Sequence, residues 1–410
     1  GSCCRSEELS AEASAPPSSK MMFLLALSVL VISVQDLEAL WPALFFLGVA
    51  SAFNNWLWRL FVFGVSWGLI LPQFPTSFVA LLYFLVVYNV PLFSLGGVRP
   101  PQPVQGAVFI TGCDSGMGFW TAGLLADQGY QVVAGCFTLN ESQQKLKAHT
   151  KKPENLVAVA LDVTSDQSVA AALKFTKARC AELGLQGLVG IINCAGMGYN
   201  GPAEYFPLSM YERQMNVNFF GYVRVVQALM PLVRAGTGSG QGERRGRVVF
   251  IGTGGGVLSP APPLLSAYMA SKWAIEAFSG CLRLELQLTE QPIDACVLNP
   301  GFVKPTALME QGLALTKSMW AACAKAVGSD QAQQEYGDLL NTFIEYSANE
   351  PGTHVSEVAK TMVKIMAAHR PYATYKVGPD SAAAPFVGIL PTAIREFIVK
   401  YSMYKKVGKV

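Results

Sequence analysis

Val108-Phe109-Ile110-Thr111-Gly112-Cys113-Asp114-Ser115-Gly116-Met117-Gly118 is the stretch that decides the fold. Its apolar start is typical of a buried strand, and three glycines follow at once. Gly112 permits a tight turn, Gly116 lets backbone amides approach a ligand, and Gly118 lets a following helix pack against the strand. A helix that begins here offers unpaired N–H groups and the positive end of its dipole to a pyrophosphate. The stretch indicates a dinucleotide-binding turn, for which an ordinary tight turn between strand and helix is the alternative.

The turn opens a series of short β-branched runs that alternate with longer helical stretches. Such alternation is typical of βαβ units, whose parallel sheet is covered by helices on both faces. We therefore predict an α/β fold, a Rossmann-like doubly wound parallel sheet, over residues 107–380. A glycine turn at the first strand of this series favours the dinucleotide interpretation. The expected strands are Val108–Thr111, Gln131–Cys136, Leu156–Leu161, Gly190–Asn193, Arg247–Ile251 and Ile293–Leu298.

Composition excludes several classes of protein. The 410 residues carry 31 Lys and Arg against 28 Asp and Glu, a net charge of +3, which builds no basic face for nucleic acid. Hydrophobic residues make up 51% and charged residues 14%, so the chain as a whole is neither disordered nor fibrous. The mean hydropathy of +0.32 indicates that part of the chain lies in lipid.

The N-terminal segment carries the membrane prediction. Residues 1–20 are polar and rich in Ser, Glu and Pro, which predicts disorder. Residues 21–95 are almost continuously apolar, and their only charged residues are Asp36, Glu38 and Arg59. We predict a transmembrane region of about three spans there, followed by a linker at 96–106. A signal peptide or a buried core helix is the alternative for one such run, but a region of this length disfavours both.

Cysteine and histidine usage predicts no metal site. Nine Cys are present, mostly inside apolar runs and without a CxxC pair, which favours a reducing compartment or simple core packing. The three histidines, His149, His354 and His369, lie far apart in the sequence, so no zinc site is expected.

A second constellation lies further along the predicted sheet. Tyr268 and Lys272 are four residues apart, so a helix places both side chains on one face. A free phenol has a pKa of about 10 and is a poor base at neutral pH. A neighbouring ammonium favours the phenolate, so we expect Lys272 to lower the Tyr268 pKa and to hold a ribose hydroxyl. Such a pair is most often a solvated helix face, and the dinucleotide turn upstream is what favours chemistry here.

The ends of the second and third expected strands bear on the choice of cofactor. The second ends at Cys136, with neither an acid for a ribose 2′-hydroxyl nor a base for a 2′-phosphate. The absence of Arg and Lys favours NAD over NADP without excluding NADP. Asp162 and Val163 follow the third strand. Asp162 is placed to accept a hydrogen bond from the adenine amino group, with a turn or helix-capping acid as the alternative.

Together these motifs resemble the short-chain dehydrogenase/reductase family. The chain carries TGxxxGxG at 111–118, NxAG at 193–196, Asn218 in a helical stretch, Thr253 after a strand, YxxxK at 268–272 and then Pro300-Gly301. The order is that of the family, and the motifs cover roughly residues 105–310. The glycine turn, the run at 134–137 and the tail at 370–392 resemble a membrane-bound branch. That branch holds 11β- and 17β-hydroxysteroid dehydrogenase type 2, the retinol dehydrogenases and 3-hydroxybutyrate dehydrogenase.

The resemblance implies a catalytic tetrad and a nicotinamide cofactor, NAD or NADP. Asn218 would organise a water in a proton relay, and Thr253 would hold the substrate oxygen. Tyr268 would be the general acid/base, and Lys272 would lower its pKa and bind the nicotinamide ribose. Val303 would meet the carboxamide through its backbone. The implied cofactor-binding residues are Gly112, Ser115, Gly116, Met117, Gly118, Cys136, Asp162, Val163, Asn193, Ala195, Gly196, Tyr268, Lys272, Pro300, Gly301, Val303 and, at the phosphates, Thr306.

The sequence departs from the family pattern at several positions. Thr253 stands where the branch usually has Ser, and 15 residues rather than 13 separate it from Tyr268, so the loop at 254–263 carries an insertion. Thr keeps the hydroxyl donor and acceptor, and activity is therefore expected, with an altered substrate fit. Cys194 replaces the usual second Asn of NNAG, and Pro305 adds a residue before Thr306, which weakens the phosphate assignment.

Substrate and compartment follow from the resemblance and the membrane anchor. The implied reaction exchanges a hydride between NAD(H) and a primary or secondary alcohol or carbonyl of a lipophilic substrate, a steroid or a retinoid. We expect a substrate cap at 303–350, a C-terminal tail at 381–410 that contacts the membrane or a second copy, and a homodimer. The expected location is the endoplasmic reticulum membrane, with the catalytic domain facing the cytosol. Apolar candidates for lining the cap are Phe302, Leu308, Met309, Leu313, Met319 and Trp320.

Two alternative functions stay open. One is a dehydrogenase for a small hydroxy acid of the 3-hydroxybutyrate type, which needs a cation for the carboxylate. Only Lys272 and Lys304 lie next to the tetrad in sequence. The other is a catalytically inactive nicotinamide-binding scaffold or sensor in the membrane, which Thr253 and the loop insertion favour.

Overall fold

The computed structural model describes residues 106–237, 245–254, 261–306, 318, 320, 321, 323, 325, 329–388 and 390–406. The predicted disordered N-terminus, the predicted spans and the linker up to residue 105 lie outside the described residues. Within the described ranges, no helix is both long and apolar enough to cross a bilayer.

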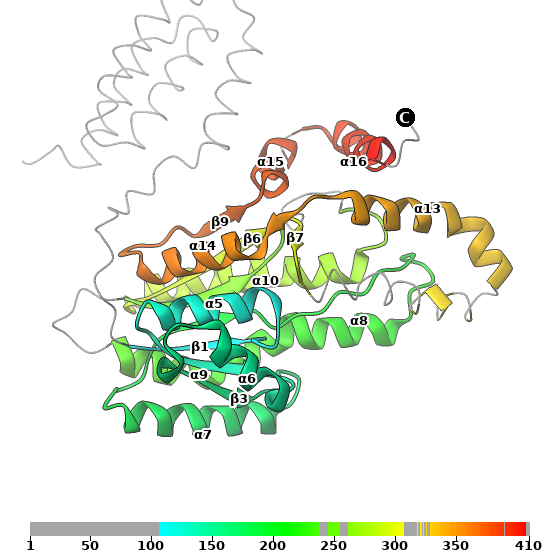
Figure 1. Ribbon diagram of the computed structural model, residues 1–410. Coiled ribbons are helices and arrows are strands. Elements are labelled where there is room, and N and C mark those ends of the chain that lie inside the picture. Colours follow the sequence, from blue (N-terminus) through cyan, green and yellow to red (C-terminus); the bar gives the residue numbers. More distant parts are fainter. Residues whose placement is uncertain are drawn as a thin grey trace, which may run out of the picture. The chain divides into compact units, whose positions relative to one another are not determined.

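Seven parallel strands form the central sheet in the order β3-β2-β1-β4-β5-β6-β9 (Figure 1). Every residue of β1, β4 and β5 is buried, as expected for strands with helices on both faces. The six strands predicted from the sequence are all present, whereas β9 was not predicted. The bounds are β1 Ala107–Thr111, β2 Gln131–Cys136, β3 Leu156–Ala160, β4 Leu188–Asn193, β5 Gly246–Ile251, β6 Ile293–Pro300 and β9 Thr374–Val377.

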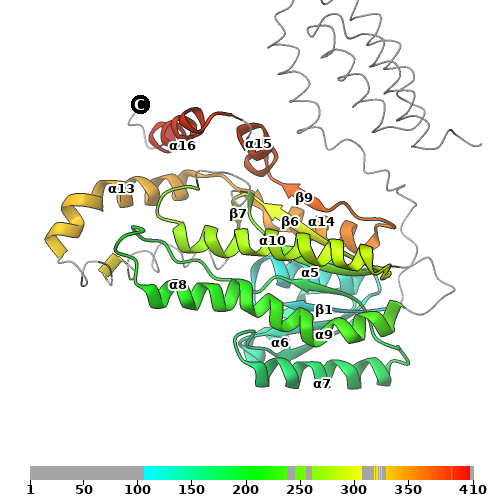
Figure 2. The same cartoon turned by 180° about the vertical axis from the view of Figure 1, so that it is seen from behind.

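Two layers of helices cover the sheet, and alternate strand residues point to each. Val108 and Ile110 of β1 belong to the core under α5, α6 and α14, while Ala107 and Phe109 belong to the core under α7, α9 and α10. In Figure 1 the layer with α5 and α14 faces the viewer, and in Figure 2, seen from behind, α10 and α9 lie in front. The predicted doubly wound architecture is therefore confirmed. The bounds are α5 Gly116–Asp127, α6 Leu139–His149, α7 Asp166–Glu182, α9 Gly221–Thr237, α10 Ser266–Leu288 and α14 Val355–Ala367.

The segment with Asn218 is helical, as expected, but it is not a regular helix. A wider π-helical turn, Asn216–Phe220, joins α8 (Leu208–Met215) to α9. Such turns are rare and are frequent at functional sites. Here the turn buries the Asn218 side chain completely.

The C-terminal part of the chain builds a subdomain beside the sheet. A two-stranded parallel ribbon joins β7 to β8, and α13 packs on α16 through a small core with Leu264, Leu340, Phe343 and Met403. Both helices lie at the same end of the domain in Figures 1 and 2. The remaining bounds are η1 Pro153–Asn155, β7 Val303–Lys304, α13 Ser329–Asn349, β8 Thr353–His354, α15 Pro379–Gly388 and α16 Thr392–Lys406.

Candidate active site

The glycine turn lies at the switch point of the sheet, where β1 and β4 are neighbours and the strand order reverses. Gly112 has a φ of +68°, and a Cβ there would meet the Ala195 Cα at 2.7 Å. The Thr111 hydroxyl joins the two strand ends by accepting from the amides of Cys194 at 3.0 Å and Ala195 at 2.9 Å. A Cβ on Gly118 would meet the Gly112 carbonyl oxygen at 2.3 Å, so glycine is what lets α5 start this close to β1.

The N-terminus of α5 fits a pyrophosphate. Ser115, which precedes the helix, makes no side-chain cap, and the first turn carries no acidic residue. Gly116 has a φ of +59°, and the nearest neighbour of a Cβ there would be the Thr306 side chain at 3.6 Å. The first amides of a helix have no partner within it, which leaves those of Gly116, Met117 and Gly118 for an anion. Thr306, predicted to bind the phosphates, lies beside this turn despite the extra Pro305.

At the adenosine end, two predicted side chains face the protein. The Cys136 side chain is buried and points back toward the Ala134 carbonyl, at 3.6 Å, so only its backbone is placed for a ligand. The Asp162 carboxylate accepts from the Thr164 amide at 2.8 Å and the Thr164 hydroxyl at 2.7 Å. This is the turn role that the sequence left open for Asp162. Val163 is buried, and the binding of adenine by either residue stays a prediction.

The four residues of the predicted tetrad converge where β5 ends and α10 begins. Lys272 Nζ lies 5.8 Å from the centroid of the Tyr268 ring, one helical turn away. The Thr253 hydroxyl hydrogen-bonds to the Tyr268 phenol. A Cβ on Gly196 would lie 3.5 Å from Asn218 Oδ1 and 3.9 Å from Lys272 Nζ, so the NxAG motif lies beside the predicted tetrad.

Asn218 is held rigidly by its neighbours. Its Nδ2 donates to the Met197 carbonyl at 2.9 Å and to the Ser271 hydroxyl at 3.0 Å, and its Oδ1 accepts from the Met197 amide at 2.9 Å. Ser271 was not predicted, although its place between Tyr268 and Lys272 in YxxxK was the available signal. Asn193 is also buried, and its Nδ2 donates to the Val249 carbonyl at 3.3 Å, which braces β4 against β5.

Burial sets the protonation of the central pair. Burial raises the pKa of Tyr268 to about 12, and the hydrogen bond from Thr253 acts in the opposite direction. Burial lowers the pKa of Lys272 to about 8, and the Lys272 ammonium donates to the Ile251 carbonyl at 2.8 Å. Lys272 is not among the groups that shift the Tyr268 pKa here, so its expected lowering of that pKa stays a prediction.

The loop after β6 is held by residues that the sequence did not single out. The Gly301 amide donates to the Val377 carbonyl at 2.9 Å, and the Phe302 amide donates to Asp380 Oδ2 at 2.8 Å. The Ser381 hydroxyl donates to the Asn299 carbonyl at 2.6 Å. The start of α15 thus supports the Pro300-Gly301 motif.

Val303 and Lys304 extend this loop into β7. Val303 is buried and pairs with Thr353 of β8. Lys304 Nζ donates to the carbonyls of Ser347 and Ala348, both at 3.3 Å, and of Glu350 at 2.5 Å. Lys304 therefore caps the C-terminal end of α13, where the helix dipole favours a cation.

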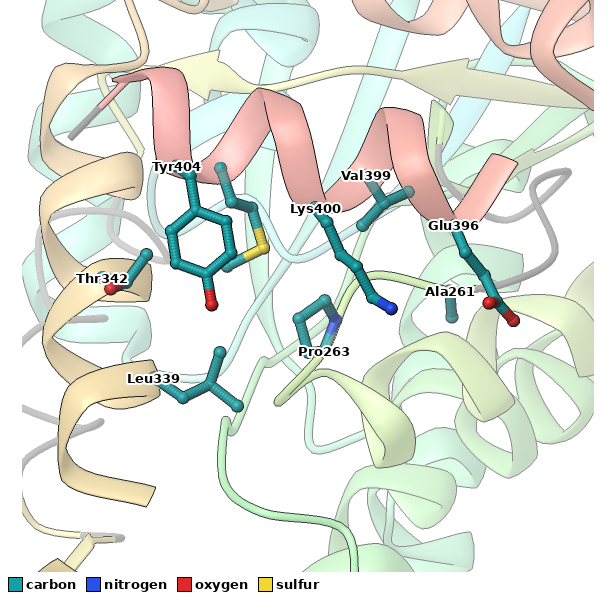
Figure 3. Close-up of a pocket in the computed structure, with 9 residues that line it drawn as sticks. Ala261, Pro263, Leu339, Thr342, Glu396, Val399, Lys400 and Tyr404 are labelled. Atoms are coloured by element: carbon teal, nitrogen blue, oxygen red, sulfur yellow. The ribbon is translucent and has the colours of Figure 1, made fainter. Parts of the chain in front are cut away.

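A mostly apolar cavity of about 330 Å³ lies between α13, α16 and the end of the loop insertion. In Figure 3, Leu339 and Thr342 of α13 and Lys400 and Tyr404 of α16 project toward Pro263. Pro263 lies five residues before Tyr268 in the sequence, and none of the four tetrad residues lines the cavity. Its lining residues are Ala261, Pro263, Leu339, Thr342, Glu396, Val399, Lys400, Met403 and Tyr404.

Two reciprocal hydrogen bonds join α13 to the loop before α8. The Tyr205 hydroxyl donates to Glu335, and the Tyr336 hydroxyl donates to Glu204 at 2.5 Å. The two tyrosine rings meet edge to face, 5.6 Å apart. Of the predicted cap residues, Trp320 packs near Leu264 and Phe302 contacts Tyr346. The other four, Leu308, Met309, Leu313 and Met319, lie outside the described residues.

Comparison with known proteins identifies the family of the chain. Residues 106–314 match the family model of the short chain dehydrogenases. Human short-chain dehydrogenase/reductase family 9C member 7 is 30% identical over 298 residues, 71% of this chain and 88% of that protein. Bovine mitochondrial D-beta-hydroxybutyrate dehydrogenase is 30% identical over 300 residues, 71% and 83% of the two chains. Bovine 17-beta-hydroxysteroid dehydrogenase type 6 is 30% identical over 302 residues, 73% and 89% of the two chains.

Solved structures agree on the fold. The 3-ketoacyl-(acyl-carrier-protein) reductase of Brucella melitensis, complexed with NADH, aligns with a TM-score of 0.51 and 20% identity. The match covers 67% of this chain and 98% of that one. The protein belongs to the short-chain dehydrogenase/reductase family, as the motifs predicted.

Proposed function

We propose that this protein is a nicotinamide-dependent oxidoreductase that exchanges a hydride with an alcohol or carbonyl group of a lipophilic substrate. The observation that carries the proposal is the convergence of Tyr268, Thr253, Lys272 and Asn218 beside the glycine turn. Tyr268 and Lys272 share the YxxxK motif, whereas Thr253 and Asn218 come from two other segments, and all four lie close together in the fold. A purely structural role for these side chains would not require a phenol, a hydroxyl and a buried ammonium in one place.

Tyr268 is the proposed general acid/base. As a phenolate, the Tyr268 side chain takes the hydroxyl proton of the alcohol during oxidation, and as a phenol it returns that proton to the carbonyl oxygen during reduction. Thr253, which already hydrogen-bonds to the phenol, holds the substrate oxygen in the same place. Lys272 supplies a buried ammonium next to the ring, and Asn218 fixes the backbone at Met197 from which a proton relay would extend.

The cofactor would lie along the α5 N-terminus, with Gly116 to Gly118 at the pyrophosphate and Lys272 at the nicotinamide ribose. When bound, nicotinamide supplies the carbon that accepts or gives the hydride. We propose NAD in preference to NADP, since no Arg or Lys follows β2 at Phe137 or Thr138. The Pro300-Gly301 loop and Val303 would meet the carboxamide, with Asp380 as the group that holds this loop in position.

The cavity supports a lipophilic substrate. Its lining is mostly apolar, with Glu396 and Lys400 as the charged residues, and its volume of about 330 Å³ is in the range of small-molecule pockets. We propose that the cap at 303–350 and α16 together enclose the substrate over the start of α10. The relative named for 17-beta-hydroxysteroid dehydrogenase activity favours a steroid, and a retinoid is the related possibility.

A small hydroxy acid is the rival substrate, and a relative is named for it. Binding of its carboxylate requires a cation near Tyr268. Lys304 is engaged with three carbonyls at the end of α13, and Lys272 donates to the Ile251 carbonyl. Neither of these two cations is therefore placed as a carboxylate clamp. Lys400, which lines the cavity, is the cation that the rival substrate would use.

Membrane attachment is part of the proposal. The predicted spans at 21–95 would anchor the chain in the endoplasmic reticulum with the catalytic domain in the cytosol. The helix α16 exposes Ile394, Phe397 and Tyr401, and Lys405 lies over the Tyr401 ring, a pattern that suits a lipid surface. A homodimer that covers this helix is the alternative, and sedimentation of the protein with anionic vesicles would distinguish the two.

The test of the substrate class is turnover by membranes that contain the full chain. Steroid alcohols, retinol and 3-hydroxybutyrate are each supplied with NAD⁺ and with NADP⁺. We expect oxidation of a steroid or retinol and none of 3-hydroxybutyrate. Oxidation of 3-hydroxybutyrate alone would replace the proposed substrate class. Absence of all turnover, with NAD⁺ binding retained, would favour the scaffold or sensor function instead.

A further inference from the structure

Asp114, the second variable residue of the glycine turn, lies at the centre of a hydrogen-bond cluster that the proposed chemistry does not use. Its Oδ2 accepts from the Phe137 amide at 2.9 Å. Its Oδ1 accepts from the Thr138 amide at 2.7 Å, the Thr138 hydroxyl at 2.9 Å and the Ser142 hydroxyl at 3.0 Å. Two amides and two hydroxyls therefore converge on one carboxylate.

The cluster sits where a dinucleotide fold decides between NAD and NADP. Phe137 and Thr138 directly follow Cys136, the last residue of β2. In such folds the adenosine ribose lies at this strand end, and residues there recognise its 2′-hydroxyl or 2′-phosphate. In this chain the strand end offers neither the usual acid nor a base, so the discriminating group must come from elsewhere.

The donors around Asp114 are those of an anion site. Thr138 is the residue before α6, and Ser142 lies in its first turn, so the cluster includes the positive end of that helix. Two backbone amides and two hydroxyls at a helix start would suit a phosphate. Partial burial raises the pKa of Asp114, but the bonds from Thr138, Phe137 and Ser142 outweigh it and hold the pKa below its ordinary value, so the group stays charged at neutral pH.

We propose that Asp114 makes the site selective for NAD by filling, with its own carboxylate, the donors that the 2′-phosphate of NADP would otherwise use. A 2′-phosphate would meet a fixed negative charge and amides that already have a partner. The 2′-hydroxyl of NAD carries no charge, so Asp114 does not repel it, and it does not need the amides of Phe137 and Thr138 as donors. Asp114 is thus a specificity-determining residue, and the inference rests on the proposed cofactor site at the glycine turn.

The test compares Asp114→Ala with a matched loss of charge. Glu141, also in the first turn of α6, is exposed and outside the cluster, so Glu141→Gln removes a nearby negative charge without opening the donors. Dissociation constants of NAD⁺ and NADP⁺ are measured by calorimetry on the full chain in detergent. Adenosine 2′,5′-bisphosphate against AMP then locates any change in the adenosine half.

For wild type and Glu141→Gln we expect NAD⁺ to bind more tightly than NADP⁺. In Asp114→Ala the preference for NAD⁺ should fall by roughly tenfold or more, through tighter binding of NADP⁺ and of the bisphosphate. Asp114→Asn keeps an oxygen for the amides but removes the charge. It should shift the ratio of the NADP⁺ and NAD⁺ dissociation constants in the same direction, but by less. It decides the question if the alanine variant does not fold.

Three results would overturn the inference. An unchanged ratio in both Asp114 variants, with NAD⁺ binding intact, would reduce Asp114 to a loop brace and leave the proposed function standing. An equal shift in Glu141→Gln would assign the effect to the general potential rather than to the cluster. Failure of wild type to bind either dinucleotide would remove the proposed cofactor site itself, and the inference with it.

Discussion

Gly116 and Gly184 form a matched pair that tests the phosphate cradle. Gly116 has a φ of +59° and Gly184 a φ of +68°, and at neither position would an added methyl group have a neighbour closer than 3.6 Å. An alanine with a backbone in this left-handed conformation costs about 1 kcal/mol of strain. We therefore expect Gly116→Ala and Gly184→Ala to lower the free energy of unfolding equally, by an amount that corresponds to roughly 1–2 °C in Tm for a domain of this size.

The two variants should differ in cofactor affinity. A methyl group at Gly116 lies in the open space before the α5 N-terminus, where the pyrophosphate is expected, whereas Gly184 follows α7, away from the turn. Loss of one hydrogen bond to a charged phosphate is worth about 1.5–3 kcal/mol, or roughly 10–100-fold in Kd. Urea unfolding and calorimetry with NAD⁺ measure the two quantities on the same samples.

Equal NAD⁺ affinity in the two variants would refute the reasoning, because it would mean that no ligand approaches Gly116. Gly118→Ala provides a second contrast. Its methyl group would meet the Gly112 carbonyl oxygen at 2.3 Å, so it should destabilise the protein further, by about 1–3 kcal/mol beyond the glycine pair.

Three further substitutions test other parts of the structure. The Lys272 pKa is lowered to about 8 in the folded protein, so the unfolded chain binds this proton more tightly. The buried ammonium therefore destabilises the fold below about pH 8, and the protein gains that stability back as the pH rises toward 10.5. The stability advantage of Lys272→Met in urea should therefore shrink over that range, by up to about 3 kcal/mol, and parallel curves would contradict the shift. Lys304→Met should lower the free energy of unfolding by about 1 kcal/mol through the uncapped α13, while Lys304→Arg keeps most of it; no loss in the Met variant would remove the capping role. Asp294→Asn leaves Arg247, only 3% exposed, without its carboxylate at 2.6 Å, and about 3 kcal/mol should be lost; a loss below about 1 kcal/mol would mean that the carbonyls of Ala368 and His369 suffice for Arg247.

Local sequence patterns were sufficient for six of the seven strands of the sheet and for the placement of Tyr268 and Lys272 on one helix. Each strand of the doubly wound core is a short β-branched run bounded by turn residues, and the spacing of Tyr268 and Lys272 places both on α10. Thr306 also lies beside the glycine turn, as predicted.

Contacts between distant segments were beyond the sequence patterns. Asp380 holds the Phe302 amide from 78 residues away, and Asp114 reaches Phe137 and Thr138 across the turn; nothing in a single sequence marks such pairs. The effect of burial on the Tyr268 pKa was also not visible in the sequence. The helical spacing to Lys272 is visible in the sequence, but the desolvation that raises the pKa of the phenol depends on the packed fold.

Tyr268 and Tyr222 allow the central claim to be tested with one comparison. Lys272 Nζ lies 5.8 Å from the Tyr268 ring centroid and 5.6 Å from that of Tyr222, but Thr253 hydrogen-bonds only to the first phenol among the described contacts. The measurement is the rate of NADH formation with saturating NAD⁺ and the best lipophilic alcohol, for Tyr268→Phe and Tyr222→Phe. We predict a loss of about 10²–10⁴-fold in kcat for Tyr268→Phe, with unchanged NAD⁺ affinity, and near wild-type turnover for Tyr222→Phe. Comparable turnover by the two variants would contradict the role of Tyr268 as general acid/base.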